Sequence, residues 1–297
     1  MLRQPHQRSR TGRSLRDGRL DTGAAVTSIG RYAVFGQPIA HSLSPRIHAA
    51  FGAQLGIALD YRAIEAGRDG FAARVAAFAR DGGRGANVTL PLKQDALVLC
   101  ADLSERARRA GSVNTLIRVG DGWHGDSTDG AGLLRDLRER HGFDSCGRRV
   151  LLLGAGGAAR AAAFAFADAG ASELAIANRT FDRAAELAQA IGDAARAVAL
   201  DELEALGRFD LVVNATAAGH AGTSAALPRS LLDADALCYD LSYGKAAQAF
   251  LDAARRAGAS RASDGLGMLV EQAAESFAVW HGTRPETAAV YAALREG

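Results

Sequence analysis

Lysine is almost absent from this 297-residue chain, in which arginine supplies nearly every positive charge. Of the 35 basic residues, only Lys93 and Lys245 are lysines. An ammonium group can release a proton when its surroundings lower its pKa, whereas a guanidinium group stays protonated in proteins. Lys93, in the segment 85–93, is therefore our first candidate for a proton-transfer residue. The alternative interpretation is a solvated surface lysine in an arginine-rich chain.

Cysteine, long apolar runs and clusters of metal ligands are also scarce. The three cysteines, Cys100, Cys146 and Cys238, form no Cys-x-x-Cys pair, which argues against a disulfide framework and for a reducing compartment. No uninterrupted apolar run approaches the roughly 18 residues of a membrane span. His41 and His48, the histidines closest in sequence, form no metal-binding pattern with nearby carboxylates. We therefore expect no metal, no membrane partner and, without an apolar signal segment, a cytoplasmic location.

Positive charge is concentrated at the N-terminus. Residues 1–28 contain six arginines and two aspartates, a local charge of +4, so the remainder of a chain whose net charge is +2 carries −2. The segment has no aromatic residue and no apolar periodicity. We expect a dispensable disordered extension rather than a nucleic-acid contact or a transit peptide.

Hydrophobic patterning predicts alternating strands and helices along the rest of the chain. In the first half we expect strands over 31–35, 59–64, 86–90, 114–119 and 123–125 and helices over 45–55, 71–80 and 103–110. Ser44 has the chemistry of a helix N-cap, and Pro45 suits the first helical position. In the second half, the apolar run 149–153 is typical of a buried parallel strand, and we expect a helix to about residue 170 and strands near 174–178, 209–214 and 236–241.

This alternation predicts an α/β protein with mostly parallel sheets. Two domains are the default expectation for this length. We place an N-terminal α/β substrate domain at 29–129 and a doubly wound, Rossmann-like domain at 130–264. The helical segment 265–297 has no strand of its own, and we expect it to return to the first domain.

A dinucleotide fingerprint follows the strand 149–153. Gly154-x-Gly156-x-x-Ala159 stands between a strand and an alanine-rich helix, where a bare backbone lets a pyrophosphate approach free helix N-terminal amides. The residues expected to surround the phosphates are Gly154, Ala155, Gly156, Gly157 and Ala158.

The end of the next strand indicates which dinucleotide binds. It carries Asn178, Arg179 and Thr180, then Arg183, and no carboxylate for ribose hydroxyls. Guanidinium groups pair well with a 2′-phosphate, so the sequence favours NADP(H) over NAD. The alternative for the two arginines is a solvated cluster at a helix start, and a flavin or S-adenosylmethionine is a more distant alternative for the loop.

Polar residues in the first half suit a hydroxylated acid. Ser42 and Ser44 are two apart, so in an extended segment both hydroxyls face one way, near a helix start that favours anions such as a carboxylate. Asn87 and Thr89 share a strand face by the same rule and point toward Lys93. Asn114 and Asp129 add further groups able to bind hydroxyls. For the two serines, a capping and turn role is the alternative.

Eight ordered motifs between residue 31 and the C-terminus resemble the shikimate dehydrogenase family. They are Phe35-Gly-Gln-Pro-Ile-Ala-His-Ser-Leu-Ser-Pro45, Ala86-Asn-Val-Thr-Leu-Pro-Leu-Lys93, Gly111-Ser-Val-Asn-Thr115, Ser127-Thr-Asp-Gly130, Gly154-Ala-Gly-Gly157, Asn178-Arg-Thr180, Asn214-Ala-Thr216 and Asp264-Gly-Leu-Gly-Met-Leu-Val-Glu-Gln272.

The resemblance implies reversible NADPH-dependent reduction of 3-dehydroshikimate to shikimate, in aromatic amino-acid biosynthesis. It implies that Lys93 and Asp129 form a catalytic pair and that the substrate is bound by Ser42, Ser44, Asn87, Thr89, Asn114, Tyr243 and Gln272. It adds Thr216 and Gly265 to the cofactor site. A relative acting on quinate or an aminated substrate, and a non-catalytic NADP-binding sensor, remain alternatives. We expect a monomer or a homodimer.

Overall fold

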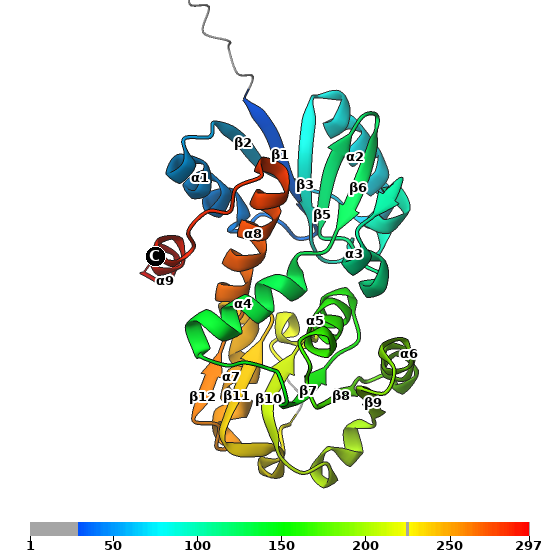
Figure 1. Ribbon diagram of the computed structural model, residues 1–297, viewed down its shortest axis with the longest axis vertical. Helices are drawn as coiled ribbons and strands as arrows, with labels where there is room; N and C mark the ends of the chain where they lie inside the picture. The colour runs from blue at the N-terminus through cyan, green and yellow to red at the C-terminus, as the bar shows by residue number, and fades with distance from the viewer. Residues whose placement is uncertain (1–28, 224–225, 297) are drawn as a thin grey trace, which may run out of the picture.

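The computed structural model describes residues 29–223 and 226–296, and these form two six-stranded sheets with helices packed on them (Figure 1). The predicted disorder of 1–28 concerns residues outside this range. No helix in the described ranges is long and apolar enough to cross a membrane. The same residues contain no group of three or more potential metal ligands that could hold an ion.

The first sheet is mixed, with the order β2-β1-β3-β5-β6-β4. Its strands are β1 (Gly30–Gly36), β2 (Leu59–Glu65), β3 (Gly83–Val88), β4 (Asp102–Leu103), β5 (Thr115–Val119) and β6 (Gly122–Asp126). The strands β2, β1 and β3 are parallel, but β5 runs antiparallel to both β3 and β6. The prediction of a mostly parallel sheet is confirmed, because β4 and β6 run in the same direction as β1, β2 and β3 and only β5 is reversed. The reversal occurs because the two residues between β5 and β6 can only close a hairpin.

The second sheet is entirely parallel, with the order β12-β11-β10-β7-β8-β9. Its strands are β7 (Arg149–Leu153), β8 (Glu173–Ala177), β9 (Ala195–Val198), β10 (Phe209–Asn214), β11 (Leu232–Asp240) and β12 (Arg261–Ser263). Counted along the chain from β7, this is the doubly wound order 3-2-1-4-5-6. The order reverses between β7 and β10, and the crevice at this switch point is where such sheets bind ligands.

Helices connect and cover both sheets. They are α1 (Ser44–Leu55), α2 (Phe71–Arg80), α3 (Glu105–Ala110), α4 (Asp129–His141), α5 (Gly157–Asp168), α6 (Phe181–Ile191), α7 (Lys245–Arg256), α8 (Leu266–His281) and α9 (Ala288–Glu296). The predicted bounds of α2 and β7 are confirmed to the residue. Helix α1 begins one residue earlier than predicted, with Leu43 at the N-cap and Ser44 as its first helical residue.

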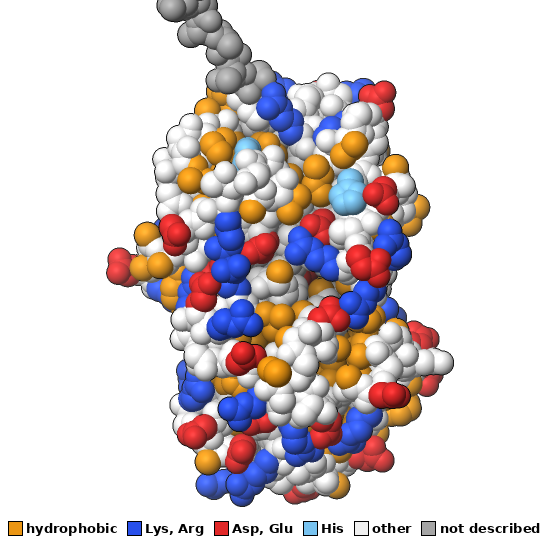
Figure 2. Space-filling view, viewed as in Figure 1, with side chains coloured by type: hydrophobic (Ala, Val, Ile, Leu, Met, Phe, Trp, Pro, Cys, Tyr) orange, Lys and Arg blue, Asp and Glu red, His pale blue; other side chains and the backbone are white. Residues whose placement is uncertain are grey.

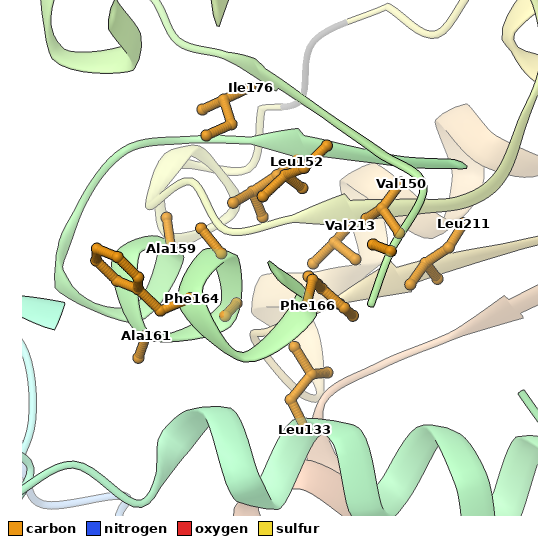
Figure 3. Close-up of a cluster of buried hydrophobic side chains, with 14 of the residues drawn as sticks. Leu133, Val150, Leu152, Ala159, Ala161, Phe164, Phe166, Ile176, Leu211 and Val213 are labelled. Carbon is orange, nitrogen blue, oxygen red and sulfur yellow. The ribbon is translucent and has the colours of Figure 1, made fainter. Parts of the chain in front are cut away.

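Two apolar clusters hold the second sheet between helices. Figure 3 shows Leu152, Val213 and Ile176 facing the α5 side chains Phe164 and Phe166, and all of these are buried. Leu133 of α4 joins the same cluster, so α4 packs against the second sheet. In the surface view, hydrophobic side chains gather at the level of α4 and α5, whereas charged side chains are scattered above and below them (Figure 2).

The C-terminal helices return to the first sheet, as predicted. Helix α8 lies beside α4 and reaches α1 (Figure 1). Its buried residues Val270 and Phe277 pack against Ile47 and Phe51 of α1. Helices α4 and α8 therefore form the connection between the two sheets.

Candidate active site

Lys93 and Asp129 meet at the junction of the two sheets. The Lys93 Nζ donates a hydrogen bond to Asp129 Oδ2 at 2.5 Å, and the two side chains are only 15% and 5% exposed. Lys93 lies in the turn after β3, and Asp129 is the first residue of α4, where the helix dipole favours a carboxylate. The structure therefore places an ammonium group and a carboxylate in contact at a largely buried position.

Asn114 fixes the second oxygen of the same carboxylate. Its Nδ2 donates to Asp129 Oδ1 at 2.9 Å, while its Oδ1 accepts the backbone N–H of Thr128 at 2.8 Å. A backbone N–H can only donate, so this bond sets which end of the Asn114 amide faces Asp129. Gln272 of α8 joins the group, with its Oε1 3.2 Å from Asn114 Nδ2. Four predicted site residues, Lys93, Asp129, Asn114 and Gln272, are thus brought together.

Asn87 lies on β3 beside this group and is 5% exposed. The Tyr61 hydroxyl donates to its Oδ1 at 2.7 Å, and its Nδ2 donates to the Asn114 backbone carbonyl at 3.1 Å. Thr89 immediately follows β3, which ends at Val88. Its N–H still donates to the Phe35 carbonyl of β1 at 2.8 Å, so the pairing between the two strands continues to this residue.

Ser42 and Ser44 lie at the start of α1, in a turn rather than in an extended segment. Ser42 Oγ accepts the Ser44 N–H at 3.3 Å, so Ser42, and not Ser44, provides a side-chain acceptor at this helix start. The N-cap prediction for Ser44 is wrong because Ser44 is itself helical. The side chain of Tyr243, after β11, reaches the Leu43 backbone between the two serines, and burial raises the pKa of its phenol.

The fingerprint turn lies at the switch point of the second sheet. Gly154 follows β7 with φ of 118°, and a Cβ there would lie 2.9 Å from the carbonyl oxygen of Ala215, just after β10. Helix α5 begins at Gly157 after an N-cap glycine and has no side-chain cap, so its first amides are available to an anion. Ala155 and Ala158 complete this turn without adding bulk. This backbone geometry fits a pyrophosphate.

The same turn lies close to Lys93. A Cβ on Gly157 would lie 3.5 Å from the Cβ of Lys93 and 3.2 Å from that of Ser112. The Ser112 hydroxyl also donates to the Gly157 carbonyl at 3.1 Å. A dinucleotide held on the α5 amides would therefore lie next to the Lys93 ammonium.

Two further cofactor candidates line the same crevice. The backbone N–H and hydroxyl of Thr216, after β10, both donate to Asn214 Oδ1, at 3.2 and 2.8 Å. Gly265, before α8, has no room for a side chain, since a Cβ would lie 2.4 Å from the Leu241 carbonyl oxygen. Both positions keep the backbone close to the ends of β10 and β11.

Arg179, Thr180 and Arg183 are exposed at the start of α6. Asn178 closes the turn by donating from Nδ2 to the Thr180 carbonyl at 2.8 Å. Within the described residues, no carboxylate lies at salt-bridge distance from Arg179 or Arg183. The positive end of the helix dipole disfavours two positive side chains at this helix start, and a bound phosphate would offset that repulsion by pairing with both guanidinium groups.

Sequence reasoning missed several buried or half-buried residues around this site. These residues contact Asn87 or Asn114, directly or through one other residue, and they are Tyr61, Thr115, Thr128, Ser276 and His48. Two of them had a usable signal, because Thr115 and Thr128 adjoin predicted residues in the sequence. Ser276 is four residues after Gln272 and hence on the same face of α8.

Three family models match the chain in order. They are described as the shikimate dehydrogenase substrate binding domain (residues 34–116), shikimate/quinate 5-dehydrogenase (137–242) and the shikimate 5′-dehydrogenase C-terminal domain (265–295).

Individual relatives match nearly the whole chain. The shikimate dehydrogenase (NADP(+)) of Stenotrophomonas maltophilia R551-3 is 58% identical over 270 residues, covering 90% of this chain and 96% of that protein. The crystal structure of an Ael1 enzyme from Pseudomonas putida has a TM-score of 0.83 at 45% identity, over 89% of this chain and 98% of that one. Shikimate 5-dehydrogenase from Thermus thermophilus, in complex with NADP(H) and shikimate, has a TM-score of 0.77 at 35% identity, over 90% and 99%. On these matches, this chain belongs to the shikimate dehydrogenase family.

Proposed function

We propose that this chain is an NADP-dependent shikimate dehydrogenase, which interconverts 3-dehydroshikimate and shikimate by hydride transfer within aromatic amino-acid biosynthesis. The observation that carries the proposal is the contact between Lys93 and Asp129 directly beside Gly157 of the fingerprint turn. In this proposal, a proton-handling pair and a dinucleotide-binding turn form the two sides of one site. The 58% identity to a relative of that name supports the same reaction.

The residues of the second sheet fit NADP(H), which supplies or accepts the hydride when it is bound. The turn from Gly154 to Ala158 would hold the pyrophosphate on the α5 amides. Asn178, Arg179, Thr180 and Arg183 would hold the 2′-phosphate, because guanidinium groups bind phosphate through paired charge-assisted hydrogen bonds. Thr216 and Gly265 would adjoin the nicotinamide end.

The polar residues of the first sheet fit a hydroxylated acid. Ser42 and Ser44, at the start of α1, would hold the carboxylate, and Tyr243 would contribute from the opposite side. Asn87, Thr89, Asn114, Asp129 and Gln272 would hold the hydroxyls. In the structure the Asn87 and Asn114 amides already have internal partners on both ends, so their orientation is set before substrate arrives.

Lys93 and Asp129 would manage the proton. During reduction, the carbonyl oxygen of 3-dehydroshikimate gains a proton as its carbon gains hydride; in the reverse direction the shikimate hydroxyl loses that proton to the pair. Asp129 uses one oxygen for Asn114 and the other for Lys93, which holds the ammonium in place. Lys93 has three donors, so it can keep this bond and still meet the reacting oxygen. It then either transfers the proton itself or stabilises the developing alkoxide.

We assign substrate binding to residues 29–129 with 265–297, and cofactor binding to 130–264. The Arg-rich segment 1–28 has no part in this proposal, and turnover should survive its deletion. The cytoplasmic location and the monomeric or homodimeric state stay predictions.

The test is NADP+ reduction with shikimate, followed by the absorbance of NADPH, with quinate and NAD+ in parallel. Wild type should turn over shikimate with NADP+, and Lys93→Ala should lose several orders of magnitude in kcat. Lys245→Ala, which removes the other lysine from an exposed position, is the matched control and should stay active.

Lys93→Arg separates the two roles of Lys93, because arginine keeps the charge and cannot give up a proton. Substantial activity in this variant would assign electrostatic stabilisation, and its loss would assign proton transfer. A folded wild type that binds NADP+ but turns over neither substrate with either cofactor would refute the proposed reaction.

A further inference from the structure

A cluster of buried hydroxyl groups lies behind the Asn87 and Asn114 carboxamides. Ser276 of α8 and Thr115 of β5 are both completely buried. Their hydroxyl oxygens are 2.8 Å apart, and Asn87 Nδ2 donates to Ser276 Oγ at 2.9 Å. The two side chains come from segments more than 160 residues apart in sequence, and Ser276 is thereby joined to the amide that lies on β3.

Some hydrogen bonds in this cluster have a fixed direction, because one partner acts in only one way. Asn87 Nδ2 can only donate, so Ser276 Oγ accepts from it. Thr115 Oγ1 donates to Asn114 Oδ1 at 2.9 Å. In the short contact between the two hydroxyls either oxygen can supply the proton, since the Ser276 hydroxyl can also donate to the Gln272 carbonyl. The result is a connected chain from Asn87 to Ser276, to Thr115 and to Asn114.

We propose that Ser276 is a positioning residue for the reaction: it couples the orientations of the Asn87 and Asn114 carboxamides, and so fixes the pattern of donors and acceptors that the substrate hydroxyls meet. The inference rests on the proposed function, because it concerns how that substrate is bound. Ser276 itself is 0% exposed and does not line the site. Its influence passes through the two amides.

The position of Ser276 on α8 explains why the cluster forms there. The Ser276 hydroxyl is also 3.0 Å from the Gln272 carbonyl, one turn earlier in the helix. Gln272 Oε1 is in turn a partner of Asn114 Nδ2. One helical turn of α8 therefore contacts both ends of the Asn114 amide, through Gln272 and, by way of Thr115, through Ser276.

Loss of the Ser276 hydroxyl should affect substrate binding more than the chemical step. The Lys93–Asp129 contact is not part of the chain, and Asp129 keeps its bond from Asn114, whose Oδ1 is still held by the Thr128 N–H. The Asn87 amino group, by contrast, loses one of its acceptors and keeps only the longer contact to Thr115 Oγ1 at 3.3 Å and the Asn114 carbonyl, and Thr115 loses its short contact with Ser276. The effect should therefore appear in KM for shikimate and not in kcat.

The experiment compares Ser276→Ala, Thr115→Val and the double variant with wild type, with KM measured separately for shikimate and NADP+. Losing one neutral buried hydrogen bond should raise KM for shikimate roughly three- to tenfold. KM for NADP+ and kcat should stay within about twofold of wild type. Because either substitution interrupts the same chain, the double variant should be little worse than the worse single variant.

Ser145→Ala is the matched control. Ser145 is also a buried serine, at 3% exposure, but its hydroxyl has no hydrogen-bond partner among the described residues. The Ser145→Ala substitution removes a serine hydroxyl that does not contact the Asn87 or Asn114 carboxamides, so the kinetics of this variant should match wild type. Melting temperatures of all variants are recorded alongside.

Two results would overturn the inference. One is an unchanged KM for shikimate in both Ser276→Ala and Thr115→Val. The other is an equal loss for both substrates that follows the drop in melting temperature, since that pattern indicates only a structural role. If Ser276→Ala does not fold, Thr115→Val, which keeps the shape of the side chain, decides the question alone. Turnover by wild type tests the proposed function separately, so the two failures are distinguishable.

Discussion

Acidification should destabilise this protein in part through a buried histidine, His48 of α1. The imidazole is 1% exposed and stacks on the Tyr61 ring, with centroids 4.2 Å apart and planes at 7°. Neither ring nitrogen has a hydrogen-bond partner among the described residues. Burial lowers the pKa of His48 to about 3, an effect that Asn87 partly opposes and His281 reinforces. The folded state therefore holds this ring neutral.

The sign of the effect follows from comparing the folded and unfolded pKa values. In the unfolded chain the pKa of His48 is its ordinary 6.5, so below that pH the unfolded state takes up a proton that the folded state does not. Stability from this group is complete above pH 6.5 and is lost as the pH falls toward 3. Between about pH 7 and pH 5, the unfolding free energy should fall by about 2 kcal/mol because of this group.

A second buried group acts with the opposite sign in the same range. Burial raises the pKa of Asp240 to about 6 from its ordinary 3.8, so Asp240 stabilises the folded state on acidification. The wild-type curve alone would mix the two effects. The proper readout is the difference between wild type and His48→Phe, because Asp240 contributes equally to both.

The assay is urea unfolding near pH 7 and pH 5, followed by the fluorescence of Trp280, whose ring lies 5.3 Å from His48. From the higher to the lower pH, wild type should lose about 2 kcal/mol more unfolding free energy than His48→Phe. Asp240→Asn provides a check of opposite sign, since wild type should gain about 1 kcal/mol relative to it over the same step. A difference between wild type and His48→Phe that does not change with pH would refute the reasoning.

Two further predictions concern the cofactor side. Arg179→Ala and Arg183→Ala should each raise KM for NADP+ about tenfold while leaving kcat and the KM for NAD+ unchanged, because only the contact with the 2′-phosphate is lost. Arg256→Ala, which removes another exposed arginine, is the control. An equal effect on the KM values of both cofactors would contradict the assignment. Gly154→Ala should lower the melting temperature and raise KM for NADP+, at a cost of about 2 kcal/mol, because its Cβ meets the Ala215 carbonyl at 2.9 Å. Gly192→Ala is the control for backbone strain, because Gly192 also has a positive φ but has open space for a Cβ. If Gly192→Ala is as damaging as Gly154→Ala, the contact of the new Cβ with the Ala215 carbonyl is not the cause.

Buried elements with strong patterns could be predicted from the sequence, and short edge strands could not. The run 149–153 is apolar throughout and forms β7 within the predicted bounds. The edge strands β9 and β12 are only partly buried and carry arginine, so they have no hydrophobic signal. The antiparallel hairpin of β5 and β6 was predictable in principle, because the two residues that separate the strands are too few for a parallel crossover.

The candidate site divides in the same way. Lys93 could be found because lysine is rare in this chain, and the glycines because a phosphate-binding turn needs a bare backbone. The role of Asn114 in holding Asp129, with Gln272 as a further partner of Asn114, could not be found, since a carboxamide suits a substrate hydroxyl and a neighbouring carboxylate equally well. Only the contacts across α4, α8 and the first sheet separate these roles.

The position of Asp129 is set by close backbone packing rather than by its own side chain. In the first turn of α4, a Cβ on Gly130 would lie 2.7 Å from the Ala161 carbonyl oxygen of α5, and one on Gly132 would lie 2.6 Å from the Gln272 nitrogen of α8. Side chains at either position would push the helices apart. Because α5 carries the fingerprint turn and α8 carries Gln272, the two glycines bring that turn, Asp129 and the Gln272 amide close together. Close packing at the two glycines thus fixes the backbone of Asp129 relative to α5 and α8, and the side chains of Lys93 and Asn114 then orient its carboxylate.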